Sequence, residues 1–124
     1  MKKIIALIII GLYSNSKLKA QDNFVGNWIT EDSLQIINIY VEDSNYYGKI
    51  IYKKVTHPKD TENKIVLIQM KKRGNKKILY GGTYFDWNIK KEYEAKLILK
   101  DTNTIYFIGY FGIFNINKVW YRVQ

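Results

Sequence analysis

The segment Tyr93-Glu94-Ala95-Lys96-Leu97-Ile98-Leu99-Lys100 carries the clearest structural signal in the chain. Its odd-numbered positions hold Tyr, Ala, Leu and Leu, whereas three of its four even-numbered positions hold Glu or Lys. Because successive side chains of a strand point to opposite faces, this alternation predicts a strand with one buried and one solvated face. Such strands are typical of antiparallel sheets, so the segment indicates an all-β fold.

Similar strand-like segments lie on both sides of this one. Residues with branched β-carbons and aromatic residues dominate after residue 20, where Ala95 is the only alanine, and this composition favours strands over helices. Turn-forming residues separate the segments, and no linker or internal repeat divides them, so residues 21–124 form one predicted domain. The eight predicted strands are 24–30, 34–41, 46–54, 65–71, 77–85, 92–100, 104–111 and 116–123.

Eight short strands with tight turns predict an all-β, eight-stranded antiparallel up-and-down barrel. Closure of the barrel pairs the edge strands that such an aromatic sheet would otherwise expose. A two-sheet β-sandwich produces the same strand and turn signals and is the alternative. A barrel of eight strands is wide enough either to be filled by side chains or to hold one small ligand.

Residues 1–20 have the layout of a secretory signal peptide. Lys2 and Lys3 precede an apolar run over 4–12, and a polar stretch leads to Ala20. The apolar run is too short for a membrane-spanning helix, which needs about 20 residues. We predict cleavage after residue 20 and export of a bacterial protein to the periplasm or the medium; a buried N-terminal strand is the alternative. Because the chain has no Cys, we do not expect a lipoprotein.

Removal of the predicted signal peptide lowers the net charge. The chain has 20 Lys and Arg against 11 Asp and Glu, a formal net charge of +9. Four of the lysines lie within 1–20, so residues 21–124 carry +5. An exported protein rarely meets nucleic acid, and we therefore expect no nucleic-acid partner. The absence of Cys and the single His argue against disulfides, thiol nucleophiles and most zinc sites.

Two short motifs at the ends of the predicted domain resemble the lipocalin and calycin pattern. They are Gly26-Asn27-Trp28 and Trp120-Tyr121-Arg122. In that pattern an indole on the first strand closes one end of the barrel, and a basic residue of the last strand packs over it. The first and last strands become neighbours when the barrel closes, and a guanidinium over an indole forms a cation–π contact. The resemblance implies a structural role in barrel closure for Gly26, Trp28, Trp120 and Arg122.

Residues 24–123 also resemble an exported bacterial family known as domain of unknown function 2147. The resemblance is strongest over Gly81-Gly82-Thr83-Tyr84-Phe85-Asp86, followed after a turn by Tyr93-Glu94-Ala95-Lys96-Leu97. The later stretch Gly109-Tyr110-Phe111-Gly112 also fits. It implies a calycin-like barrel and export. It implies no reaction, because the family has no assigned activity.

Aromatic side chains on the predicted strands are candidates for a ligand pocket, since small-molecule sites combine aromatic walls with a few polar groups. The same side chains would fill a solid core equally well, and an interior void of roughly 300 Å³ or more would favour the pocket. We predict a non-catalytic protein that binds a small, largely apolar ligand. The candidate ligand-binding residues are Tyr80, Tyr84, Asp86, Tyr93, Tyr106 and Tyr110.

The densest basic run in the chain marks a predicted hairpin tip at Gly74-Asn75. Its charges suit contact with anionic lipid or another anionic envelope surface, and an envelope-associated interaction module is the alternative function. A solvated hairpin whose charges deter aggregation is the simpler interpretation. The candidate surface-binding residues are Lys71, Lys72, Arg73, Lys76 and Lys77.

Candidate catalytic and metal-binding residues are few. His57 has no obvious nucleophile to activate, because Ser33 and Ser44 both lie in predicted turns. Glu92 and Glu94 share the solvated face of their strand with Lys96, which favours a salt-bridged surface over a glycosidase pair. The side-chain oxygens of Asp60, Asn63 and Asp86 are too few for a calcium shell and are expected to stabilise turns. We therefore predict no catalytic residue, no metal site and no cofactor.

Overall fold

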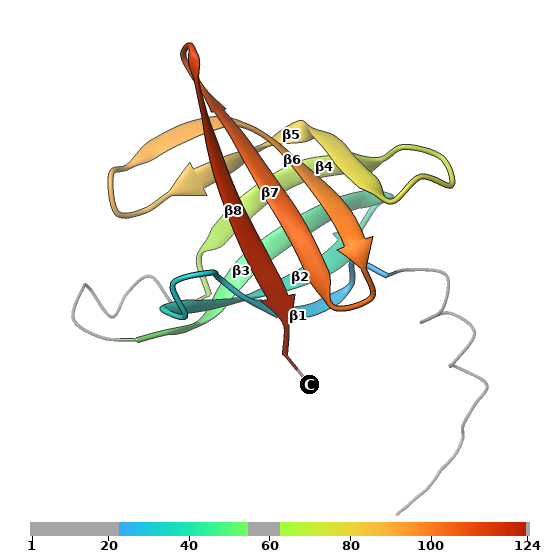
Figure 1. The fold of residues 1–124 in the computed structure, drawn as a ribbon, viewed down its shortest axis with the longest axis horizontal. Coiled ribbons are helices and arrows are strands. Elements are labelled where there is room, and N and C mark those ends of the chain that lie inside the picture. Colours follow the sequence, from blue (N-terminus) through green and yellow to red (C-terminus); the bar gives the residue numbers. More distant parts are fainter. Residues whose placement is uncertain (1–22, 55–62, 124) are drawn as a thin grey trace, which may run out of the picture.

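The structure, a computed structural model, describes residues 23–54 and 63–123. Eight strands follow one another in chain order and wrap around a common centre (Figure 1). The predicted signal peptide, His57 and Asp60 lie outside the described residues. The strands are β1 (Gly26–Ile29), β2 (Gln35–Glu42), β3 (Asn45–Lys53), β4 (Ile65–Lys72), β5 (Ile78–Asp86), β6 (Lys91–Asp101), β7 (Thr104–Phe111) and β8 (Phe114–Arg122).

These strands form one closed barrel in the order β1-β2-β3-β4-β5-β6-β7-β8. Neighbouring strands are antiparallel, and β1 completes the barrel by pairing with β8, with Trp28 opposite Arg122 and Ile29 opposite Tyr121. This pairing confirms the predicted eight-stranded antiparallel barrel and excludes the two-sheet sandwich, since a sandwich keeps free sheet edges. Within the described part of the chain, no helix is long and apolar enough to cross a bilayer.

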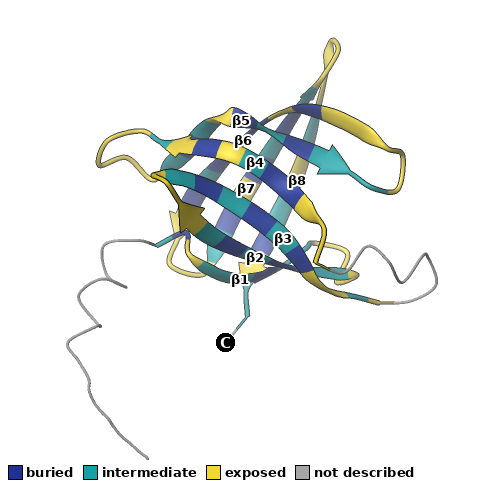
Figure 2. Cartoon of the chain, turned by 180° about the vertical axis from the view of Figure 1, so that it is seen from behind, coloured by how far each residue is buried: buried dark blue, intermediate teal, exposed yellow. Residues whose placement is uncertain are grey.

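The alternation in β6 decides which of its side chains fill the barrel. Tyr93, Ala95, Leu97 and Leu99 are buried, while the side chains between them are exposed or half-buried. Other strands alternate in the same way, and Figure 2 shows buried segments interleaved with lighter ones along the sheet. The largest fully buried side chains are Trp28, Phe24, Ile37, Ile39, Ile50, Leu67, Met70, Leu79, Leu97, Ile105 and Val66.

Two glycines make room for the tightly packed middle of the barrel. A β-carbon at Gly82 would collide with the carbonyl oxygen of Ile68 on the neighbouring strand. A β-carbon at Gly109 would strike the ring of Tyr93. The chain is therefore closely packed at these two positions, where even a methyl group does not fit.

The two ends of the barrel are built differently. The closed end carries Asn23, the C-terminal end of β8 and the β2–β3, β4–β5 and β6–β7 turns. The open end carries the β1–β2, β5–β6 and β7–β8 turns. The β7–β8 hairpin projects beyond the body of the barrel (Figure 1), and Ile113 at its tip is 91% exposed.

Candidate ligand-binding site

The closed end is sealed by Arg122 over Trp28. The guanidinium carbon of Arg122 lies 4.3 Å from the centre of the indole, which is completely buried. Arg122 Nε donates to the carbonyl oxygen of Thr102 at 2.8 Å, Nη1 donates to that of Val25 at 3.2 Å, and Nη2 donates to that of Asn23. These bonds tie β8 to the β6–β7 turn and to the segment before β1, so one side chain fastens three parts of the chain.

Gly26 and the indole nitrogen complete the seal. Trp28 Nε1 donates to the carbonyl oxygen of Phe24 at 2.9 Å, so the buried indole leaves no unpaired donor. Gly26 has a φ of 139°, and a β-carbon there would lie 2.7 Å from Arg122 Nη1. Burial lowers the pKa of Arg122 below its ordinary value, although the guanidinium remains charged at physiological pH.

Trp120, the fourth residue implied in barrel closure, lies away from this seal. Its side chain is 2% exposed and stacks on Phe107, with ring centres 5.2 Å apart and ring planes 17° apart. It lines a pocket toward the open end together with residues of the β1–β2 turn. Arg122 therefore belongs to the seal of the closed end, whereas Trp120, two residues earlier on β8, contributes to the wall of the pocket.

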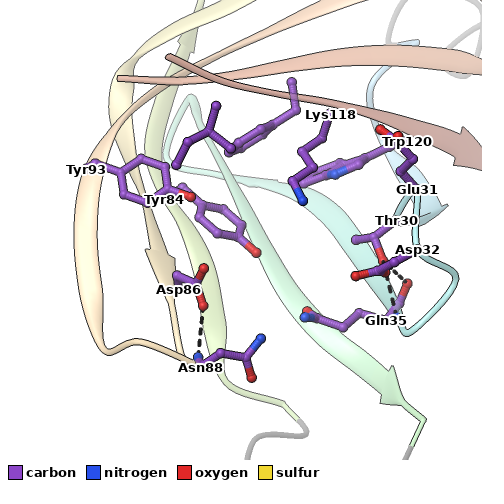
Figure 3. Close-up of a pocket in the computed structure, with 12 residues that line it drawn as sticks. Thr30, Glu31, Asp32, Gln35, Tyr84, Asp86, Asn88, Tyr93, Lys118 and Trp120 are labelled. Carbon is purple, nitrogen blue, oxygen red and sulfur yellow. Dashed lines mark hydrogen bonds between the residues drawn. The ribbon is translucent and has the colours of Figure 1, made fainter. Parts of the chain in front are cut away.

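A pocket of about 240 Å³ opens at the open end of the barrel (Figure 3). Its volume is below the roughly 300 Å³ that we set as favouring a ligand pocket over a filled core. The pocket lies at the mouth, above buried core side chains, and therefore suits a small ligand. It is lined by Thr30, Glu31, Asp32, Gln35, Tyr84, Asp86, Asn88, Tyr93, Phe107, Ile116, Lys118 and Trp120.

Aromatic rings form the floor of this mouth pocket. Tyr84 meets Phe107 edge to face at 4.9 Å between ring centres and lies 6.3 Å from Trp120. Tyr93 lies 5.7 Å from Tyr84 on the adjacent strand. Because each ring contacts at least one other, the floor is rigid and offers aromatic surface to a molecule in the mouth.

The two phenols in the mouth pocket stay protonated. Burial, together with the negative charge of Asp86, raises the pKa of Tyr93 to about 12. The pKa of Tyr84 is also raised, first by burial and then by Asp86 and other neighbours. Both hydroxyls are therefore neutral groups that can donate and accept hydrogen bonds at physiological pH.

Carboxylates stand at the rim of the mouth pocket. Asp32 accepts hydrogen bonds from Thr30 Oγ1 at 2.7 Å and from the Leu34 amide at 3.0 Å. Burial alone would raise the pKa of Asp32, but these hydrogen bonds and the charge of Lys118 lower it overall. Asp86 accepts from the Asn88 amide at 2.8 Å.

Glu31 and Lys118 complete the charged groups of the pocket. Glu31 Oε1 accepts from the Val119 amide at 2.8 Å, which joins the β1–β2 turn to β8. In Figure 3 the Lys118 amine points into the pocket near Trp120. The lining of the mouth pocket thus holds three carboxylates and one ammonium group.

The Gln35 amide has an unusual environment. Its side chain lines the mouth pocket, and its Oε1 atom is buried with no hydrogen-bond partner among the described residues. A buried acceptor without a donor costs about 1–3 kcal/mol relative to a satisfied one. Gln35 is therefore poorly explained as a purely structural residue.

Three of the six residues predicted to bind ligand line the mouth pocket, namely Tyr84, Asp86 and Tyr93. Tyr106 and Tyr110 lie on the outer face, because the inward positions of β7 are Ile105, Phe107 and Gly109. The Lys100 ammonium lies 5.5 Å from the Tyr106 ring on that outer face. Tyr106 and Tyr110 therefore lie outside the mouth pocket, and their role in binding a ligand stays a prediction.

Tyr80 is also outside the pocket, because a bulge changes the inward-facing parity of β5. The β5–β6 register shifts between Leu79 and Gly82, both of which are buried. Gly81 supplies the positive φ, 78°, that the bulge requires. Tyr80 consequently faces outward, where the Arg73 guanidinium lies 4.6 Å from its ring centre.

Gln35 and Lys118 are pocket residues that the sequence interpretation missed. Both continue an inward-facing row by steps of two, Gln35 before Ile37 and Ile39, and Lys118 before Trp120. The signal for them was therefore the same alternation that identifies the strands. The alternation shows which polar side chains point inward, and those near the barrel mouth are candidates for ligand contacts.

The predicted surface-binding residues lie at the other end of the barrel. Lys71, Lys72, Arg73, Lys76 and Lys77 surround the β4–β5 turn, whose tip is closed by the Lys76 amide donating to the Arg73 carbonyl at 2.8 Å. Lys71 Nζ lies 3.5 Å from Asn45 Oδ1. A surface hollow of about 340 Å³ beside this turn is lined by Asn23, Phe24, Lys72, Gly74, Asn75, Lys77 and Leu99.

The described residues bring together few groups with catalytic or metal-binding potential. Within 23–54 and 63–123, no three Asp, Glu or His side chains are close enough to hold a metal ion. Glu94 is exposed on the outer face of β6, and Glu92 Oε2 accepts a hydrogen bond from Thr83 Oγ1. Asp86 bonds the Asn88 amide in its own turn, the turn-stabilising role expected from the sequence.

Comparison with known proteins gives one informative likeness. The structure is similar to protein HP1028 from the human pathogen Helicobacter pylori, which belongs to the lipocalin family. The TM-score is 0.65 at 16% sequence identity, and the alignment covers 81% of this chain and 82% of that protein. No family model and no curated protein sequence matches the chain. The lipocalin-like barrel is therefore confirmed, whereas membership of the domain of unknown function 2147 family stays a prediction.

Proposed function

We propose that this chain is a small-molecule binding protein that holds its ligand in the mouth pocket. A lipocalin-like barrel with one sealed end offers a ligand access from the opposite end, and the pocket lies there. The observation that carries the proposal is the combination of aromatic floor and inward-facing polar side chains. Small-ligand sites typically combine such walls with a few convergent polar groups.

The proposed ligand is small. The mouth pocket has a volume of about 240 Å³ and lies above buried core side chains, so it suits a small ligand better than a long acyl chain. The aromatic floor accommodates one ring or a short aliphatic group, and the polar rim surrounds its remainder. The sequence-based expectation of a largely apolar ligand is thus refined to a ligand with one apolar end.

We further propose that the protein acts after export, in the periplasm or outside the cell, with residues 1–20 removed. The layout of basic, apolar and polar stretches supports this location. A binding role without catalysis fits the described residues, in which Ser33 is exposed in the β1–β2 turn. Detection of the protein in culture supernatant or osmotic-shock fluid, starting at Gln21, tests the location.

The test of ligand binding is fluorescence of the apolar probe N-phenyl-1-naphthylamine with two matched variants. Ile116→Trp fills the mouth pocket, whereas Asn117→Trp places the same ring on the outer face of the same strand. We expect the probe signal to rise with wild-type protein and with Asn117→Trp, and to be lost with Ile116→Trp. An unchanged probe signal for Ile116→Trp, or no signal with wild type, would contradict the proposal.

A second candidate function is contact with an anionic envelope surface through the β4–β5 turn. The five basic residues around that turn, on the sealed end of the barrel, favour it. Sedimentation with phosphatidylglycerol vesicles tests it, using Lys76→Glu with Lys77→Glu against Lys90→Glu with Lys91→Glu at the open end. Salt-sensitive binding lost only in the first double variant supports the surface role, and equal binding of both rejects it.

A further inference from the structure

We propose that the mouth pocket selects a small organic cation, an amine or amidine attached to a compact apolar group. This inference rests on the proposed binding function and names the chemistry of its ligand. It follows from four features of the pocket: the sign of its charge, the free carboxylate oxygens, the Gln35 amide and the aromatic floor.

The charge of the mouth pocket is opposite in sign to that of the chain. The whole chain carries +9, yet the pocket is lined by Glu31, Asp32 and Asp86 against Lys118 alone. Since like charges in one concave site repel each other, such a cluster is stabilised by a bound cation. An anionic ligand would face three carboxylates and find one ammonium partner.

The rim carboxylates keep acceptor capacity for a ligand. The hydrogen bonds to Asp32 from Thr30 and Leu34 both engage Oδ1, and the bond to Asp86 from Asn88 also engages Oδ1. Each carboxylate has a second oxygen, and an ionised carboxylate accepts several hydrogen bonds. These local bonds fix the orientation of the two side chains, so they are positioned before a ligand arrives.

Gln35 adds a neutral acceptor beside the carboxylates. Figure 3 shows its side chain extending between the Asp32 side of the pocket and Asp86. Its Oε1 atom is buried and lacks a donor among the described residues, so a ligand N–H can bond it once the amide turns toward the pocket. Amines and amidines carry several N–H donors and no anionic acceptor, which matches this set of acceptors.

The aromatic floor suits a cation as well as an apolar body. The faces of Trp120 and Tyr84 carry negative charge density, and a cation near such a face gains about 0.5–2 kcal/mol. The protonated phenols of Tyr84 and Tyr93 add oxygen acceptors without adding a positive charge. Lys118 lines the pocket and opposes a cation, so its removal should improve binding; the Lys53 ammonium, 3.2 Å from Asn88 Oδ1, is a second positive group at the same rim.

Competition with N-phenyl-1-naphthylamine tests the charge preference with three probes of similar size. They are phenethylamine as the cation, 2-phenylethanol as the neutral compound and phenylacetate as the anion. We expect phenethylamine to bind about tenfold more tightly than 2-phenylethanol, the effect of one charged hydrogen bond. Phenylacetate binding as tightly as phenethylamine, or 2-phenylethanol equalling it, would overturn the inference.

Charge-changing variants make the test specific to the site. Asp86→Asn should weaken the binding of phenethylamine about tenfold without weakening that of 2-phenylethanol. Lys118→Met should strengthen the binding of phenethylamine. Glu92→Gln, which removes a carboxylate on the outer face next to the same turn, should change neither. If 2-phenylethanol binds but these variants do not change the affinity for phenethylamine, the cation preference is wrong and the proposed binding function still stands. If no probe binds, both proposals fail.

Discussion

The two ends of the barrel differ in whether their buried polar groups have hydrogen-bond partners. At the closed end, the Arg122 guanidinium donates to three carbonyl oxygens and covers a completely buried indole. At the open end, three carboxylates and the Gln35 side chain line one pocket, and the buried Gln35 oxygen has no donor among the described residues. Satisfied polar groups stabilise a fold, whereas unsatisfied ones in a concave site are typical of recognition. We therefore attribute a stabilising role to the closed end and propose a binding role for the open end.

The largest difference between the ends should come from truncating a tryptophan at each. Trp28→Ala removes the buried indole and its contact with Arg122, and we expect the free energy of unfolding to fall by roughly 3–5 kcal/mol. Trp87→Ala, which removes a half-buried side chain in the β5–β6 turn at the open end, should lower the free energy of unfolding by about 1 kcal/mol. Urea denaturation measures the free energy of unfolding of both variants. Equal losses of stability would contradict a special stabilising role for the closed end.

A conservative change of Arg122 should be the next largest effect. Arg122→Lys keeps the charge but loses the planar group that donates in three directions, so we expect a loss of about 2 kcal/mol. Lys118→Met at the open end should change stability by less than about 0.5 kcal/mol. Thermal unfolding of the two variants in parallel checks this, and a tolerated Arg122→Lys would show that the seal contributes little.

Replacing Gln35 should separate stability from binding. Gln35→Met keeps the length of the side chain and removes the buried oxygen, so we expect stability to stay constant or rise by about 1 kcal/mol. Phenethylamine binding by the same variant should weaken severalfold. Loss of more than about 1 kcal/mol of stability would mean that Gln35 has a structural partner and is not a recognition residue.

A pH dependence of stability is expected at the open end. The pKa of Tyr93 is raised to about 12 and that of Tyr84 is raised as well, so the folded state keeps protons that the unfolded chain loses near pH 10. Stability is therefore fully present below pH 10 and falls as pH rises from 10 to 12. Denaturation across this range should show a shallower fall for Tyr84→Phe than for wild type. Tyr52→Phe, at an exposed position, should match wild type.

The barrel could be predicted from sequence because alternation along each strand repeats over many residues. The β6 alternation placed Tyr93, Ala95, Leu97 and Leu99 inside, and the structure agrees. The face of Tyr80 could not be predicted, since one extra residue at the Gly81 bulge reverses the parity of the strand before it. A bulge depends on pairing with the neighbouring strand, which a single segment does not reveal.

The mouth pocket could be predicted only in part, for a different reason. Tyr84, Asp86 and Tyr93 were found because aromatic and acidic residues are expected at sites. Lys118 and Gln35 also line the pocket, but neither carries a sequence signal for binding other than its inward position in the strand alternation. Near the mouth of a barrel, inward positions lie above the core and remain in contact with water.

The indole N–H signals of Trp28 and Trp120 provide the most direct test of the difference between the two ends. In ¹H–¹⁵N spectra recorded during titration with phenethylamine, we expect the Trp120 signal to shift to saturation while the Trp28 signal stays in place. The Trp120 indole lines the mouth pocket, whereas the Trp28 indole is sealed beneath Arg122. A saturable shift of Trp28 with no shift of Trp120 would contradict the assignment, as would the absence of any shift.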